Sequence, residues 1–113
     1  MDDPAVKIAP ITTNLRPVGT PSRLDSEMYH ALEHASAAMY PGATVLPTMS
    51  TGATDMAQLR AKGIQSYGIG PASTESDSAN YGAHSDVERL LETSLYGLVE
   101  FTWRATMEVA AKK

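Results

Sequence analysis

The sequence contains no cysteine, which excludes disulfides, thiolate metal ligands and a cysteine nucleophile but leaves the cellular compartment open. Basic residues are few: 9 Lys and Arg stand against 13 Asp and Glu, and no basic stripe indicates nucleic-acid binding. No apolar run approaches the roughly 18 residues that a membrane span needs. The acidic start, with Asp2 and Asp3, is not typical of a signal peptide. We therefore expect neither a nucleic-acid partner nor a membrane partner.

What is present fits a single globular domain, since 42% of the 113 residues are hydrophobic and 19% are charged. Short apolar stretches bounded by Pro and Gly predict strands at residues 5–11, 43–47 and 64–69. Apolar positions at helical spacing predict helices over residues 22–39, 55–62 and 86–111. The order predicts an α/β fold, β-α-β-α-β-α, with the long C-terminal helix packed on a short sheet.

A polar segment, residues 70–85, separates the last predicted strand from the last predicted helix. Structureless loops of this length are uncommon in compact domains and are often functional or mobile. Glu75 and Asp77 lie within it, in a serine-rich run. We expect both carboxylates to face solvent rather than to form a paired-carboxylate site.

His84 stands directly before the longest predicted helix. Ser85 and Glu88 have the spacing of a capping box, in which each side chain accepts from the other residue's backbone amide. The positive end of the helix dipole disfavours imidazolium and would keep the His84 ring neutral, as metal ligation requires. Taken alone, the pattern favours an ordinary loop histidine beside a helix cap over a metal ligand.

A second histidine pattern, His30-x-x-Glu33-His34, matches the H-x-x-E-H of inverted zincins. The apolar stripe of the predicted helix passes through Ala31 and Leu32, so the three polar side chains lie toward solvent. No acidic residue further along the chain is identified by its position as a third zinc ligand. We therefore reject the zincin interpretation and expect a solvated helix face.

A hydroxyl-rich loop, residues 50–55, joins a predicted strand to a predicted helix. Backbone amides at such a turn form an anion site by geometry alone. The loop lacks the lysine of a P-loop and the spaced glycines of a dinucleotide fingerprint, and a plain helix cap by Thr51 or Thr54 is the alternative. Ser50 as a nucleophile has little support because G-x-S-x-G is absent.

Three segments together resemble a known family: residues 46–55 (LPTMSTGATD), 59–71 (LRAKGIQSYGIGP) and 82–89 (GAHSDVER). They are similar to the C-terminal part of the co-catalytic zinc metallopeptidases that include aminoacylase, carboxypeptidase G and succinyl-diaminopimelate desuccinylase. The resemblance also takes in residues 22–42, so it covers nearly the whole chain.

That resemblance implies a parent enzyme that hydrolyses a peptide or N-acyl amide bond with two zinc ions and a glutamate general base. It implies that His84 is the last zinc ligand. It also implies that Ser50, Thr51, Gly52 and Thr54 line the substrate pocket near its carboxylate. Residues 1–16 would be the end of the lid or dimerisation domain with its return linker, and residues 17–113 the C-terminal part of the catalytic domain.

The chain departs from the family because the H-x-D histidine, the bridging aspartate and the paired glutamates have no counterpart in this sequence. One imidazole cannot hold a catalytic zinc, which needs about three protein ligands. We expect an inactive C-terminal fragment that has no catalytic residue of its own and binds no zinc stably.

A fragment that has lost most of its parent's sheet exposes strand edges and apolar helix faces. We therefore expect a homo-oligomer, with domain swapping as one route to it. The alternative from another functional class is a non-catalytic α/β interaction module. The compartment is not predicted.

Overall fold

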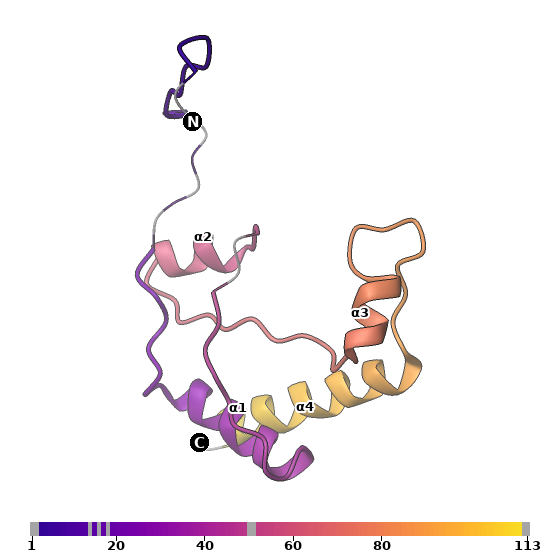
Figure 1. The fold of residues 1–113 in the computed structure, drawn as a ribbon. Helices are drawn as coiled ribbons and strands as arrows, with labels where there is room; N and C mark the ends of the chain where they lie inside the picture. Colours follow the sequence, from indigo (N-terminus) through magenta and orange to yellow (C-terminus); the bar gives the residue numbers. More distant parts are fainter. Residues whose placement is uncertain (1–2, 14, 16, 18, 50–51, 112–113) are drawn as a thin grey trace.

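The computed structural model describes residues 3–13, 15, 17, 19–49 and 52–111, and in this part of the chain the regular structure is entirely helical (Figure 1). The helices are α1 (Glu27–Met39), α2 (Met56–Ala61), α3 (Glu75–Tyr81) and α4 (Glu92–Ala110). None of these described residues belongs to a strand. The predicted α/β fold, with its short sheet and β-α-β-α-β-α order, is therefore wrong.

The backbone of Ser66 shows why the third predicted strand, residues 64–69, does not pair. Its amide donates to Ser22 Oγ over 2.9 Å, and Ser22 Oγ donates to its carbonyl over 2.8 Å. Arg60 Nη1 also donates to that carbonyl, over 3.3 Å. Side chains thus satisfy the backbone groups that a strand would offer to a neighbouring strand.

The other two predicted strands, residues 5–11 and 43–47, also lack regular structure. The first extends away from the helices in Figure 1 and leaves Ile8 96% exposed. A short apolar run indicates a strand only if a partner strand lies beside it, and that partner is set by distant sequence.

The core lies where α1 packs across the C-terminal half of α4 (Figure 1). Small side chains let the two helices approach closely. The buried residues of this contact are Ala31, Leu32, Ala35 and Ala105, with Tyr67, Phe101 and Val109 partly buried against them. Ala31, Leu32 and Ala35 of the apolar stripe predicted for the first helix are therefore in the core, whereas Leu24 and Ala38, which the same spacing includes, are exposed.

Local capping explains the start of α1 and the end of α2. Ser26, rather than Ser22, caps α1, and its hydroxyl accepts from the Tyr29 amide over 3.1 Å. Gly63 follows α2 with a φ of 81°, the left-handed backbone that ends many helices and that glycine adopts at no steric cost. The predicted α2 is close to the observed one.

Helix α3 lies inside the segment predicted to be a structureless loop. Thr74 caps it in a capping box: Thr74 Oγ1 accepts from the Asp77 amide over 3.1 Å, and Asp77 Oδ2 accepts from the Thr74 amide over 3.3 Å. The prediction of a structureless loop over residues 70–85 is therefore wrong for residues 75–81, because the polar composition hides a local capping signal.

The molecule is extended, with a radius of gyration of 18.3 Å, against roughly 13 Å for a compact domain of this length. Within the described residues, no helix is both long enough and apolar enough to span a bilayer. The packed part is thus the α1–α4 pair, and the remaining segments lie around it with much of their surface exposed.

Candidate functional site

Residues 82–91 form an irregular loop between α3 and α4, and His84 lies near its start. Ser85 Oγ donates to the Gly82 carbonyl over 2.9 Å, while the Glu88 carboxylate accepts from the His84 amide, also over 2.9 Å. The Glu88 amide donates to the Ser85 carbonyl over 3.1 Å, closing one turn. The predicted Ser85–Glu88 capping box is therefore wrong, and α4 begins at Glu92 instead of residue 86.

His84 has a left-handed backbone, with a φ of 67°, and is the one non-glycine residue with positive φ in the described part of the chain. Such a conformation is uncommon for residues other than glycine, although histidine adopts it more often than most. The residue is exposed, and its ring has no hydrogen bond or ion pair with any described residue. The loop thus holds His84 by its amide and leaves the imidazole free.

The later start of α4 removes one argument about the His84 ring. The helix dipole acts within the first turn of a helix, and His84 is separated from Glu92 by the rest of the loop. The structure therefore gives no dipole-based reason for a neutral ring at this position.

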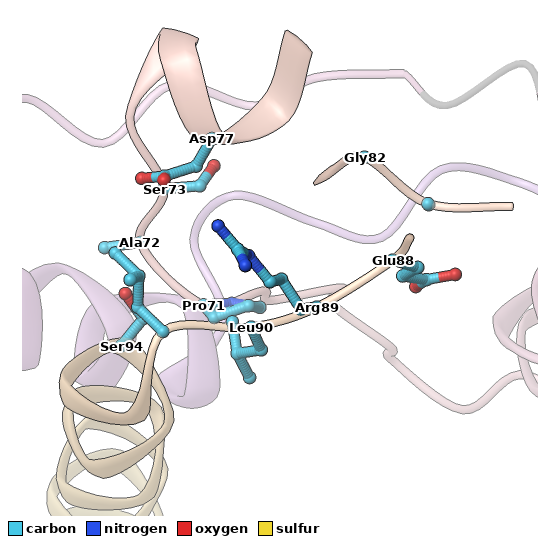
Figure 2. A pocket seen from close by; sticks show the side chains of 11 residues that line it. Pro71, Ala72, Ser73, Asp77, Gly82, Glu88, Arg89, Leu90 and Ser94 are labelled. Atoms are coloured by element: carbon cyan, nitrogen blue, oxygen red, sulfur yellow. The ribbon is translucent and has the colours of Figure 1, made fainter. Parts of the chain in front are cut away.

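A pocket of about 500 Å³ lies next to the His84 loop, between α3 and the start of α4 (Figure 2). In Figure 2 the Arg89 side chain extends toward Ser73 and Asp77, while Leu90 points to the opposite side of the segment. Apolar and polar groups therefore share the lining, as is usual for small-molecule sites. The lining residues are Pro71, Ala72, Ser73, Asp77, Gly82, Ala83, Glu88, Arg89, Leu90, Leu91 and Ser94.

Asp77 is half-buried at the pocket and is held in place by the α3 cap, where Thr74 Oγ1 donates to its carboxylate over 2.5 Å. Glu75 in the same helix is exposed. The expectation of two solvent-facing carboxylates is thus confirmed for Glu75 and wrong for Asp77. The two do not form a paired-carboxylate site, because Asp77 serves the cap.

His84 stands beside this pocket rather than in it, since its neighbours Gly82 and Ala83 line the pocket and its own side chain does not. Among the described residues, no three His, Asp or Glu side chains come together as a metal site. Zinc therefore does not fit the described residues as a set, and His84 stands as a single candidate ligand.

The predicted substrate loop is only partly visible. Ser50 and Thr51 lie outside the described residues, while Gly52 and Thr54 are exposed. Asp55 occupies the N-cap position of α2 without a side-chain bond, and Thr54 Oγ1 accepts from the Met56 amide over 3.4 Å. Neither Gly52 nor Thr54 lines the pocket beside His84.

The two histidines of α1 bond to different carboxylates. His30 Nδ1 lies 2.9 Å from Glu33 Oε2, and His34 Nδ1 lies 2.7 Å from Glu108 Oε1 on α4. Both histidines are exposed. This confirms the expected polar helix face.

A second cavity, of about 400 Å³, lies beside α1 and includes Ser22, Arg60 and Tyr67 in its lining. The Tyr67 hydroxyl bonds to the Ser26 hydroxyl and to the Arg23 carbonyl, and its ring lies 5.8 Å from that of Tyr29. These contacts join residues 64–69 to the start of α1. We assign them a structural role.

Two side-chain contacts that lie outside the pocket shift the pKa values of the residues that form them. A two-point hydrogen bond from the Arg23 guanidinium lowers the pKa of Asp25 and raises that of Arg23. Tyr96 donates to Glu92 over 2.7 Å, which raises the pKa of the phenol. Arg23, Asp25 and Tyr96 do not line the pocket.

No protein-family model, curated protein or solved structure matches this chain. The predicted metal ligand His84 lies beside the pocket, whereas no site role was predicted for the pocket residues Asp77, Arg89 and Ser94. The spacing of Thr74 and Asp77 was the available signal for α3, and thus for Asp77. Arg89 and Ser94 carry no comparable signal, because their position depends on where α4 begins.

Proposed function

We propose that this chain is the C-terminal segment of a zinc-dependent metallopeptidase or amidohydrolase, to which His84 contributes one zinc ligand. The proposal is supported by the similarity of residues 46–55, 59–71 and 82–89 to that family. The observation that carries it is the His84 imidazole, which is free and exposed on an uncommon backbone conformation. Backbone outliers of this kind cluster at functional sites.

The loop is suited to presenting a ligand. Glu88 binds the His84 amide, so the main chain is held while the ring stays available to a metal. A zinc ligand must be a neutral imidazole, usually oriented by a partner on its other nitrogen. That partner and the remaining zinc ligands would come from parts of the parent outside this sequence, so no catalytic step is assigned to this chain.

The substrate class follows from the resemblance: a peptide or an N-acyl amino acid. We expect the 113-residue chain to be inactive on its own, because one imidazole does not make a catalytic zinc site. The assay offers N-acyl amino acids and dipeptides to the purified chain with added zinc. Hydrolysis that a chelator abolishes would contradict the proposal, since this chain would then hold a complete site.

A non-catalytic interaction module is the second candidate, and it is favoured by the exposed apolar side chains of α4. The sequence encoded upstream of Met1 distinguishes between these two candidate functions. An H-x-D motif and paired glutamates there support the enzyme, whereas their absence from a complete gene contradicts it and supports the module.

A further inference from the structure

Helix α4 has two apolar faces, and only one of them is covered. The covered face packs on α1 through Phe101, Ala105 and Val109. On the opposite side, apolar residues recur at intervals of three and four, so they share one helix face. This outer stripe consists of Tyr96, Val99, Trp103 and Met107, which are 62%, 60%, 65% and 39% exposed.

No other described helix packs on the outer stripe, since α1 is the only helix with an extended contact to α4 in that part of the chain. Trp103 is also the only tryptophan of the sequence. Large aromatic side chains are among the commonest anchors of protein interfaces. A surface stripe of this kind indicates an interaction surface.

We propose that the outer stripe pairs with the outer stripe of a second copy of this chain, with the two α4 helices antiparallel about a two-fold axis. The proposal concerns the 113-residue chain and is argued from α4 alone. In an antiparallel pair centred between Phe101 and Thr102, Tyr96 lies opposite Met107 of the second copy, and Val99 lies beside Trp103. The stripe is thus complementary to its own reverse, as a two-fold interface requires.

The charges along one edge of the outer stripe fit the same arrangement. Glu100 and Arg104 are one turn apart and form an exposed ion pair within α4, with Arg104 Nη2 2.6 Å from Glu100 Oε1. In the antiparallel pair this edge meets the same edge of the second copy. Glu100 of each copy then faces Arg104 of the other, so opposite charges meet in both halves of the interface.

The area limits the strength of the pairing. Aromatic side chains bury roughly 150–250 Å² each when fully covered, and Tyr96 and Trp103 are 62% and 65% exposed, so these two residues offer roughly 250 Å² per copy. Even when Val99, Met107 and the polar residues beside the stripe are added, two copies stay below the roughly 1,200 Å² of a stable specific interface, which is the size range of weak, transient interfaces. We expect a reversible dimer in the micromolar range rather than a permanent one.

Trp103 provides the first test. As the concentration of the chain rises, sedimentation should show conversion from monomer to dimer, and Trp103 emission should move to shorter wavelength over the same range. Val99→Glu places a charge in the centre of the stripe without touching the core, and should abolish both changes while leaving the helical circular dichroism intact. A chain that stays monomeric at every concentration overturns the proposal, as does a dimer that Val99→Glu leaves unchanged.

Reversing the charge of Glu100 or Arg104 tests whether these residues meet across the proposed interface. Glu100→Arg and Arg104→Glu should each weaken self-association, because like charges then meet across the interface. A mixture of the two variants should form a heterodimer, since the first variant carries only positive charge at these two positions and the second carries only negative charge. Failure of the mixture to associate more strongly than either variant alone contradicts the proposed edge.

Orientation can be read by cross-linking, because the chain contains no cysteine of its own. Under mild oxidation, a mixture of Tyr96→Cys and Met107→Cys should give a disulfide-linked heterodimer. Neither variant should cross-link to itself. Self-cross-linking of Tyr96→Cys would indicate a parallel pair and would overturn the antiparallel arrangement.

Discussion

The α1–α4 pair and the segment between its two helices differ in how they are held. Every described residue that is buried, including Leu32 and Ala105, lies in α1 or α4. None of the described residues from 40 to 91 is buried, and that segment is fixed by bonds such as those between Ser22 and Ser66. Stability therefore resides in the helix pair, whereas the pocket and His84 belong to a region that opens at lower cost.

Leu32→Ala should have the largest effect, because it removes apolar contacts from the middle of the helix pair. Large-to-small changes at buried leucines cost about 2–5 kcal/mol, a large part of the stability of a small domain. Urea unfolding followed by circular dichroism measures the loss. Leu46→Ala is the matched control, since Leu46 is 73% exposed and its loss should change the free energy of unfolding little. Equal effects would contradict the contrast between the two regions.

Ser22→Ala should weaken the attachment of residues 64–69 without unfolding the helices. It removes the hydroxyl that bonds to both backbone groups of Ser66, at a cost of about 1–2 kcal/mol. Hydrogen exchange at the Ser66 amide should become faster. Ser66→Ala keeps the Ser22 bonds and should leave that exchange rate nearly unchanged, so an equal rise in both variants would argue against this anchor.

His84→Val tests the left-handed backbone of the loop. A β-branched residue at positive φ is a strong outlier, and the change should cost about 1–2 kcal/mol or displace the loop. His84→Gly should be tolerated, because glycine adopts this conformation at no steric cost. If valine and glycine have the same effect on urea unfolding, His84 does not adopt this backbone in solution.

The smallest effect is expected for Tyr96 at high pH. Its raised pKa means that the bond to Glu92 contributes stability below the pKa of the unfolded tyrosine, about 10, and that this contribution is lost as the pH rises through the folded value. The tyrosinate absorbance lost in Tyr96→Phe gives the titration of this group. Glu92→Gln should lower the Tyr96 pKa toward its ordinary value, and an unchanged titration would contradict the assigned cause.

The sequence predicted the parts of the fold that depend on local signals. The apolar stripe through Ala31 and Leu32 located α1, and Gly63 located the end of α2. Ser85 and Glu88 had the spacing of a helix cap, yet both side chains bond elsewhere in the loop. Spacing alone does not decide between competing local hydrogen bonds.

The sheet and the pocket depend on contacts between distant parts of the chain. Residues 64–69 have strand-like composition, but Ser22 takes the bonds that a neighbouring strand would need. The pocket likewise brings Asp77 of α3 to the segment that leads into α4. His84 was predicted as a candidate ligand, whereas its positive φ has no signature in the residues around it.

We propose that His84 is a zinc ligand in a parent enzyme, and measuring the metal content of that enzyme is the direct test. The full-length product of the reading frame is purified as wild type, His84→Ala and His30→Ala, and zinc and amide hydrolysis are measured in each. We expect His84→Ala to lose about one of two zinc ions and nearly all activity, and we expect His30→Ala, which changes an exposed residue of α1, to retain both. Full zinc content and full activity in His84→Ala would contradict it.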